Sequence, residues 1–213
     1  MRVDHVIYGV RDLDEGIKWF RQEYGLEAVH GGSHPHGSSM AIISLGPGQY
    51  LELLAPTDPS SDGPMTRYLN KLTANGDRFS GVCLLPTDLD AVATRLSLQI
   101  REASRIPPGG DEIRWRIAGV EAAYGPLHRR LPYFIDWQDS FGPAIETILR
   151  PQLDIQPAES RLMGIAWVEM GGDRERLREW IGSDTEEIRA VGGEPGPHAV
   201  AVRRSDDTLL IIR

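Results

Sequence analysis

The feature that most constrains the fold of this chain is a repeat in the order of its predicted elements. Residues 11–14 read Arg-Asp-Leu-Asp and residues 87–90 read Thr-Asp-Leu-Asp, so Asp88 stands 76 residues (88 − 12) after Asp12. In both places a β-branched, apolar stretch precedes the tetrapeptide and a helical pattern follows it. A repeat of element order predicts a fold built from two similar units.

The first unit is predicted to be a βαβββ module over residues 1–56. Residues 4–10 favour a strand, and Asp12 is placed to cap a helix whose apolar positions continue to Tyr24. Gly25 fits a left-handed C-cap of that helix. The remaining strands of the module are predicted over residues 26–30, 40–45 and 50–54, with a glycine- and histidine-rich loop over 31–37.

The second unit is predicted over residues 78–138 and a third, shorter βαβββ-like unit over residues 158–213. In the second unit we expect strands over 79–85, 112–118 and 132–137, a helix from Leu89 and a loop over 106–110. In the third we expect a strand over 164–170, a helix capped by Asp173 and a hairpin around 205–207. A helix over 65–72 and a turn-rich linker over 151–157 are expected to join the units. The chain is therefore predicted to be an α+β protein, with residues 1–150 as one domain of two modules and the third module appended.

The third unit has two ways to cover its sheet edge. An unpaired βαβββ unit leaves strand edges open to another chain. The unit either pairs with its twofold mate in a homodimer, which is the assembly we expect, or packs back on the first two units.

Charge and composition exclude several classes of partner. The chain has 23 Lys and Arg against 31 Asp and Glu, so its net charge is −8. Such a surface repels phosphate backbones and anionic headgroups, and we expect no nucleic acid and no membrane as partner. The single cysteine, Cys83, cannot form an internal disulfide. A cytoplasmic protein with a small-molecule ligand is the expectation.

Six short motifs follow one another along the first two units. They are Asp4-His5-Val6-Ile7-Tyr8, Asp12-Leu13-Asp14, His34-Pro35 before a Gly-Ser-Ser step, Tyr50-Leu51-Glu52-Leu53, Arg114-Trp115-Arg116 and Phe134-Ile135-Asp136-Trp137. In this order they resemble the glyoxalase-like domains of the vicinal-oxygen-chelate superfamily. The resemblance implies that the two modules pair into a cupped, eight-stranded mixed sheet around an open cleft. It also implies metal ligands on the first and last strands of each module.

Carried over to this chain, the resemblance places one metal ligand at His5 and another at Glu52. In the second module the first-strand position falls at Gly81, which carries no ligand, and Asp136 is the nearest last-strand equivalent. The cofactor that the resemblance implies is a divalent ion such as Zn, Ni, Mn or Fe. From the residues alone, an imidazole beside a buried carboxylate suits a divalent ion and a hydrogen-bonded pair equally.

Two histidines in the glycine-rich loop are further candidates. His34 and His36 alternate in an extended segment and point to one side, where they can polarise a substrate oxygen or contact solvent alone. His34 matches the His-Pro step of the resemblance and is predicted to be catalytic together with Glu52, and His36 is predicted to bind substrate. Alternation along the first strand predicts that His5 shares a face with Val3 and that Asp4 points to the opposite face.

The second unit supplies three predicted substrate-binding residues. Arg116 is able to clamp a carboxylate in bidentate fashion or to form a structural ion pair. Asp136 lies in an apolar strand, where a third acid near Glu52 would complete a cation site or raise the pKa of one carboxyl group. Trp137 either stacks on a ligand or fills the core.

These residues predict a protein that acts on a small oxygenated molecule, with metal-assisted isomerase, lyase or hydrolase chemistry. Two alternatives stay open: a non-catalytic binding protein of the resistance type, and a scaffold whose site has decayed. The sequence has no phosphate-binding glycine loop, nucleophile elbow or His-Glu-x-x-His helix. Serine or cysteine nucleophile chemistry therefore has no support.

Overall fold

The structure is a computed structural model of the chain, and it describes residues 1–105, 112–124, 130–138, 141–182 and 186–213. The loop expected over 106–110 lies outside these ranges. The α-helices of the described ranges are α1 (Leu13–Tyr24), α2 (Pro64–Leu72), α3 (Leu89–Leu96), α4 (Val120–Tyr124), α5 (Phe141–Asp154) and α6 (Arg174–Ile181). The strands of the first module are β1 (Arg2–Gly9), β2 (Val29–His34), β3 (Ser38–Gly46) and β4 (Gln49–Pro56). Those of the second are β5 (Arg78–Leu85), β6 (Ile100–Arg105), β7 (Ile113–Ala118) and β8 (Tyr133–Asp136), and those of the third are β9 (Leu162–Gly171), β10 (Ile188–Val191), β11 (Gly196–Arg204) and β12 (Leu209–Ile212).

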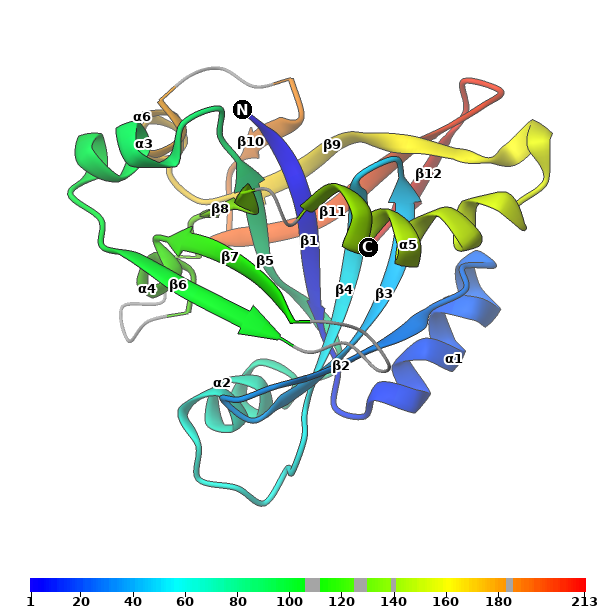
Figure 1. The fold of residues 1–213 in the computed structure, drawn as a ribbon, viewed down its shortest axis with the longest axis horizontal. Coiled ribbons are helices and arrows are strands. Elements are labelled where there is room, and N and C mark those ends of the chain that lie inside the picture. The colour runs from blue at the N-terminus through cyan, green and yellow to red at the C-terminus, as the bar shows by residue number, and fades with distance from the viewer. Residues whose placement is uncertain (106–111, 125–129, 139–140, 183–185) are drawn as a thin grey trace.

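Eight strands form one curled, mixed sheet in the order β2-β3-β4-β1-β5-β8-β7-β6 (Figure 1). At its centre β1 and β5 pair antiparallel, and each also pairs in parallel with the last strand of its own module. The edge strands β2 and β6 contact each other, so the sheet closes into a cup. The predicted α+β class and the predicted eight-stranded sheet of two βαβββ modules are confirmed.

The local sequence explains why the two modules begin alike. The Asp12 side chain accepts a hydrogen bond from the backbone N–H of Glu15, and the Asp88 side chain accepts one from the N–H of Ala91. Each aspartate thereby satisfies a backbone donor that the first helical turn leaves free. Gly25 ends α1 with a φ of 68°, a left-handed conformation that glycine adopts without strain.

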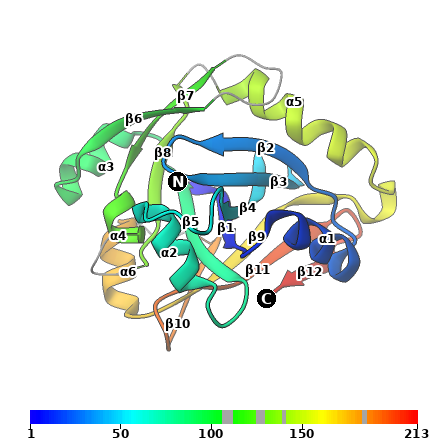
Figure 2. The ribbon, with the colours of Figure 1, turned by 90° about the horizontal axis from the view of Figure 1, so that it is seen from below.

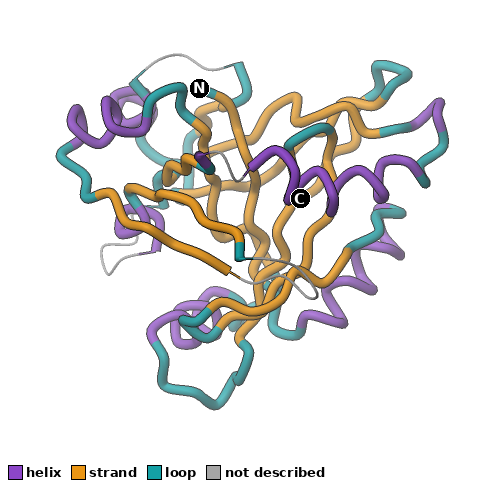
Figure 3. The backbone as a smooth tube through the Cα atoms, viewed as in Figure 1, coloured by secondary structure: helices purple, strands orange, loops and turns teal. Residues whose placement is uncertain are grey.

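Strand alternation divides the buried residues of the cup between two faces. The convex face carries Val6, Tyr8, Ala41, Ile43, Leu51 and Leu53, and α1 and α3 pack on it. The concave face carries Ile7, Met40, Ile42, Tyr50 and Leu54, and residues of α2 and α5 pack there. Figure 2 shows α1 and α5 on opposite sides of the sheet. In Figure 3 the strands occupy the interior and the helices lie around them.

The third module covers the convex face of the cup within the same chain. Its strands form a second sheet in the order β10-β9-β11-β12, with β10 parallel to β9 and β11 antiparallel to both its neighbours. This pairing order differs from that of the first two modules, although the element order βαβββ is the same. β9 packs against β3 and β11 against β5, and Val168 and Val200 share one core with Val6.

Several elements differ from the sequence expectation. The stretch 151–157 was expected to be a linker, but α5 continues through Pro151 to Asp154. Pro151 lies inside the helix and removes one i→i−4 hydrogen bond there, but the buried side chains of Leu149 and Leu153 anchor this end of α5 in the core. β2 reaches His34, within the stretch 31–37 that was expected to be a loop, and the sequence analysis did not predict α4, α5, β6 or β10. No helix in the described ranges is long and apolar enough to cross a membrane.

Candidate functional site

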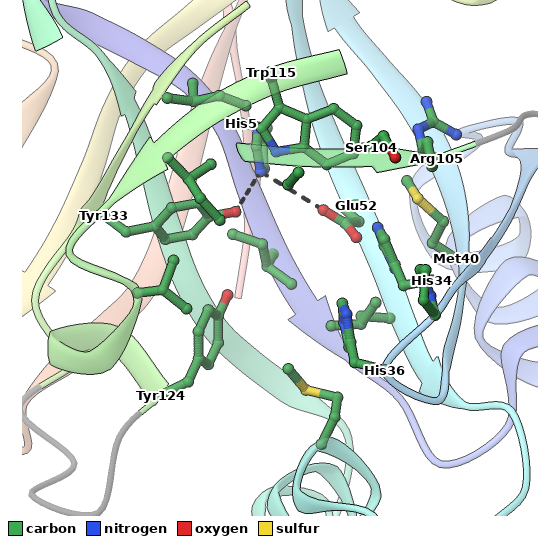
Figure 4. Close-up of a pocket in the computed structure, with 18 of the residues that line it drawn as sticks. His5, His34, His36, Met40, Glu52, Ser104, Arg105, Trp115, Tyr124 and Tyr133 are labelled. Atoms are coloured by element: carbon green, nitrogen blue, oxygen red, sulfur yellow. Dashed lines mark hydrogen bonds and ion pairs between the residues drawn. The ribbon is translucent and has the colours of Figure 1, made fainter. Parts of the chain in front are cut away.

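A cavity of about 630 Å³ opens on the concave face of the cup (Figure 4). Its volume lies in the range of small-molecule binding sites. Most of its wall is apolar or aromatic, from Ile7, Met40, Tyr50, Leu54, Met65, Trp115, Ile117, Tyr124, Tyr133, Ile135 and Trp137. The ionisable or basic residues of the wall other than tyrosine are His5, His34, His36, Glu52, Glu102 and Arg105.

The floor of the cavity is formed by two neighbouring strands that carry His5 and Glu52. β1 and β4 pair in parallel and Ile7 is in register with Glu52, so strand alternation directs both His5 and Glu52 to the concave face. His5 Nε2 lies 3.6 Å from Glu52 Oε2, and the His5 ring stacks on Tyr50 with centroids 4.6 Å apart. The 3.6 Å separation is too long for a hydrogen bond, but one substrate atom can contact both groups.

Asp4 lies behind His5 on the concave side of β1, whereas strand alternation predicted it on the opposite face. The register between β1 and β5 shifts between Val3 and His5, and this bulge turns both Asp4 and His5 to the concave side. Asp4 is completely buried. It accepts hydrogen bonds from His5 Nδ1 at 2.6 Å and from Trp137 Nε1 at 3.0 Å. The expectation that Asp4 faces away from His5 is therefore wrong.

These partners assign the tautomer of His5. A carboxylate only accepts hydrogen bonds, so the His5 proton is on Nδ1, facing Asp4. His5 Nε2 then carries a lone pair and accepts a hydrogen bond from the Tyr133 hydroxyl group, whose oxygen lies 2.8 Å away (Figure 4). Asp4, His5 and Tyr133 thus form a chain of hydrogen bonds that ends in the cavity.

Burial shifts the protonation of the groups around this chain. It raises the pKa of Glu52, more strongly than the nearby His5 and Arg105 lower it. It also raises the pKa of the Tyr124 and Tyr133 hydroxyls well above their ordinary value. The two phenols therefore stay protonated and serve as hydrogen-bond donors, whereas Glu52 gains and loses its proton closer to neutral pH.

The position that matches His5 in the second module is Gly81, and Tyr124 fills the space beside it. A Cβ at residue 81 would lie 2.6 Å from the Tyr124 hydroxyl oxygen. With Tyr124 in this place, residue 81 has room for glycine but not for a residue with a Cβ. Where the second module would have offered a side chain from its first strand, the cavity receives a phenol from α4 (Figure 4).

His34 and His36 lie on the opposite wall from Tyr124 (Figure 4). Their rings stack with centroids 4.9 Å apart, and Ser38 Oγ lies 3.1 Å from His34 Nδ1 and 3.2 Å from His36 Nε2. Burial, and then the neighbouring basic groups of His36 and Arg105, lower the pKa of His34 to about 3. Burial also lowers the pKa of His36. Both rings are therefore neutral at physiological pH and offer hydrogen bonds rather than charge.

One group of metal-ligand types occurs in the described residues: Asp4, His5 and Cys83, with ligand atoms within 4.8 Å of one another. Both Asp4 oxygens already accept hydrogen bonds, from His5 and Trp137. Burial raises the pKa of the Cys83 thiol, and a protonated thiol is a poor metal ligand. This group is accounted for by hydrogen bonding and does not fit a divalent ion.

The predicted ligands His5 and Glu52 are close enough to share an ion, but the set is incomplete. Catalytic zinc sites use about three protein ligands. Gly81 has no side chain, the neighbouring Tyr124 phenol is protonated, and the permanent charge of Arg105 in the same cavity opposes a second cation. The donor set of the described residues does not fit a resident divalent metal.

Two of the predicted substrate-binding residues lie away from the cavity. Arg116 donates to Asp136 Oδ2 at 2.6 Å and to Asp90 Oδ2 at 3.0 Å, and neither Arg116 nor Asp136 is among the described lining residues. Burial alone would raise the pKa of Asp136, but the hydrogen bonds from Arg116 keep it below its ordinary range. The side chains of Arg116 and Asp136 alternate with the cavity-facing Trp115, Ile117 and Trp137, so the structure does not bring them to Glu52.

Arg105, Tyr124 and Tyr133 line the cavity and Asp4 lies behind His5, and the sequence analysis assigned none of these residues to the site. A tyrosine or arginine in an apolar stretch carries no motif of its own, and strand alternation misplaced Asp4. The glycine at the missing ligand position was the one available signal, because it marks a place that another side chain enters.

Known proteins share the sequence pattern and the fold of this chain. A model of the glyoxalase-like domain family matches residues 3–185, and no curated protein sequence matches the chain. A hypothetical protein from Staphylococcus aureus is 16% identical, with 98% of this chain and 84% of that chain covered and a TM-score of 0.60. A Streptomyces coelicolor methylmalonyl-CoA epimerase variant in complex with 2-nitronate-propionyl-CoA is 24% identical, with 67% of this chain and 99% of that chain covered and a TM-score of 0.47. The Mycobacterium tuberculosis methylmalonyl-CoA epimerase is 26% identical over 63% of this chain and 86% of that chain, with a TM-score of 0.45.

The family match extends through both modules and into the third. The likeness to the Staphylococcus aureus protein shows the same fold over nearly the whole chain. The chain belongs to the glyoxalase-like domain family of the vicinal-oxygen-chelate superfamily.

Proposed function

We propose that this protein is an enzyme that moves a proton at a carbon atom next to an oxygen-bearing group, such as a carbonyl, in a small molecule with a largely apolar body. The observation that carries the proposal is Glu52, a buried carboxyl group with a raised pKa, 3.6 Å from the His5 Nε2 lone pair in an apolar cavity. A general base or acid works best when its pKa is near the working pH, and burial shifts Glu52 in that direction. Isomerase and lyase reactions both contain such a step.

The two phenols are suited to hold the substrate oxygen. When a base removes a proton next to a carbonyl, negative charge develops on the carbonyl oxygen, and donors already in place lower the barrier. Tyr124 and Tyr133 both reach the cavity, and both remain protonated because burial raises their pKa. We assign to Tyr124 the donation of a hydrogen bond to that oxygen.

His5 and His34 support this step through hydrogen bonds. Asp4 fixes the His5 ring through Nδ1, so that Nε2 accepts a hydrogen bond from Tyr133 and holds this phenol at the cavity. His34 stays neutral and offers a hydrogen bond from the wall opposite Tyr124. We assign to Glu52 the carbon-bound proton and to His34 a polar contact with the substrate oxygen.

No step of this proposal passes through a metal ion, because the donor set is incomplete. We expect protein treated with a chelator and dialysed to keep its activity. Loss of activity on chelation, with recovery on addition of Zn, Ni, Mn or Fe, would contradict the metal-free chemistry. It would favour a metal ion that is held by His5 and Glu52 and whose remaining ligands come from the substrate.

The experiment that tests the proposal follows proton exchange rather than a named product. The wild-type protein is incubated in deuterium oxide with a panel of small ketones, aldehydes and oxo acids, and proton NMR records the loss of the signals of hydrogens next to the carbonyl. We expect accelerated exchange in at least one compound that binds, and loss of that acceleration in Glu52→Gln. The matched control is Glu23→Gln on the exposed side of α1, which should leave the rate unchanged.

The same experiment separates the enzyme from a binding protein. The apolar wall and the adjacent Trp115 and Trp137 rings, 5.3 Å apart, suit ligand binding without chemistry. Compounds that bind with no accelerated exchange would contradict the proposal and support a non-catalytic binding protein. Accelerated exchange that persists in Glu52→Gln would contradict the role assigned to Glu52.

A further inference from the structure

Arg105 is a buried cation whose charge the described protein leaves without a close counter-ion. It is the last residue of β6 and its residue surface is 5% exposed. One of its nitrogens, Nη1, donates to the backbone carbonyl of Gly31 on β2 at 2.5 Å. This bond joins the two edges of the cup. Within the described part of the chain, Arg105 makes no ion pair with a carboxylate within 4.0 Å.

The other guanidinium nitrogens of Arg105 make no further hydrogen bond among the described residues. Arginine has five N–H donors in a fixed fork, and the contact with Gly31 uses only one nitrogen. No other guanidinium nitrogen of Arg105 is both fully shielded from solvent and without a hydrogen-bond partner, although the residue as a whole is buried. Because Arg105 lines the cavity, we take the remaining exposed surface of the guanidinium to lie there.

The other groups of the cavity do not neutralise this charge. No second arginine and no lysine is among the described residues that line it. His34 and His36 are neutral, Glu52 lies beyond the 4.0 Å of an ion pair with Arg105, and Glu102 is exposed. A permanent cation in a mostly apolar hollow attracts an anion strongly, since little water screens it.

We propose that Arg105 binds a carboxylate group of the substrate, so that the cavity takes a small carboxylic acid whose carbonyl lies within reach of Glu52 and the phenols. The planar fork of arginine matches the two oxygens of a carboxylate. This inference rests on the proposed function for the position of the reacting carbon, whereas the anion site itself rests only on Arg105 and the cavity.

Binding of matched acid and ester pairs tests the anion site in the intact protein. The probes are pyruvate with methyl pyruvate and phenylpyruvate with methyl phenylpyruvate, measured by isothermal titration calorimetry. A hydrogen-bonded contact between charged groups favours the acid by about 10- to 100-fold over the uncharged ester. Equal affinity for acid and ester in the wild-type protein, or no binding by either acid, would overturn the assignment.

Variants identify Arg105 as the source of the preference. Arg105→Gln should abolish the preference for the acid, and Arg105→Lys should keep part of it, because lysine retains the charge without the fork. The control is Arg101→Gln on the same strand, since Arg101 is exposed and pairs with Glu121; its preference should be unchanged. A preference that survives in Arg105→Gln would contradict the inference. Arg105 also joins β6 to β2, so the acid and ester comparison in the wild type stands even if this variant fails to fold.

The two proposals fail in different ways. If the acids bind through Arg105 but no exchange of carbon-bound hydrogens is accelerated, the proposed proton transfer is wrong and the anion site stands. If exchange depends on Glu52 but is equally fast with the acids and their esters, the reaction stands and the role of Arg105 is wrong.

Discussion

Replacement of Asp4 tests the hydrogen-bonded chain that positions His5. Asp4 is completely buried and accepts one hydrogen bond from His5 Nδ1 at 2.6 Å and one from Trp137 Nε1 at 3.0 Å. In Asp4→Ala both donors lose their acceptor, and a hydrogen bond to a charged group contributes about 1.5–3 kcal/mol. We therefore expect the free energy of unfolding to fall by about 3–6 kcal/mol.

Asp4→Asn separates the electrostatic role of Asp4 from its packing. The asparagine carbonyl can accept from Trp137 Nε1, but its amide then donates to His5 Nδ1. The His5 proton would move to Nε2, which could no longer accept the Tyr133 hydroxyl. We expect a loss of about 1–3 kcal/mol and a reversed His5 tautomer.

Urea denaturation measures the stabilities, and long-range proton–nitrogen NMR correlation reports which His5 nitrogen carries the proton. The control is Asp14→Ala, because Asp14 is 85% exposed and makes only a 3.6 Å contact with His30; its effect should stay within about 0.5 kcal/mol. A loss below about 1 kcal/mol in Asp4→Ala, or an unchanged tautomer in Asp4→Asn, would refute the reasoning.

Three further predictions follow from the same cavity. Burial raises the pKa of Glu52, so the contribution of Glu52 to stability is fully present below the ordinary glutamate pKa and is lost as the pH rises through the raised value. Urea denaturation at a series of pH values should therefore show the stability of Glu52→Gln, relative to the wild type, rising between these two pKa values. A stability difference that does not change with pH would count against the burial of the carboxyl group. The pKa of His34 is lowered to about 3, so as the pH drops from about 6.5 the imidazole is protonated first in the unfolded chain and the free energy of unfolding falls. His34→Gln should reduce this pH dependence of the free energy of unfolding by up to about 1.4 kcal/mol per pH unit. An unchanged pH dependence would contradict a neutral His34. In Gly81→Ala the new Cβ would lie 2.6 Å from the Tyr124 hydroxyl oxygen, so we expect a loss of about 1–3 kcal/mol from overpacking that shrinks in the Tyr124→Phe background; equal losses in both backgrounds would mean that Tyr124 does not occupy this space.

The fold was predictable where local signals agree with the tertiary structure. Asp12 and Asp88 cap their helices and stand 76 residues apart (88 − 12); the repeat of element order predicts two similar modules, and the family resemblance implies that they pair. The signals that failed are those set by tertiary contact. Pro151 reads as a helix breaker, but buried residues on either side of it hold the last turn of α5 in the core.

The site was predictable only in part, because its geometry depends on irregular backbone and on distant strands. His5 and Glu52 lie on adjacent regular strands, and alternation places them correctly. Asp4 joins them through a bulge that the sequence does not mark. Tyr124 and Arg105 enter the cavity from α4 and from the edge strand β6, two elements that the sequence analysis did not predict.

The measurement that tests the account most directly is the pKa of the Glu52 carboxyl group in the folded protein. Carbon NMR of protein labelled at the glutamate side-chain carboxyl, with Glu52→Gln used to assign the resonance, follows this one group through a pH titration. We predict a midpoint above that of an ordinary glutamate, because burial raises the pKa of Glu52 more than the neighbouring His5 lowers it. A midpoint at or below the ordinary value would show a Glu52 that is permanently ionised at neutral pH and would contradict its proposed part in proton transfer.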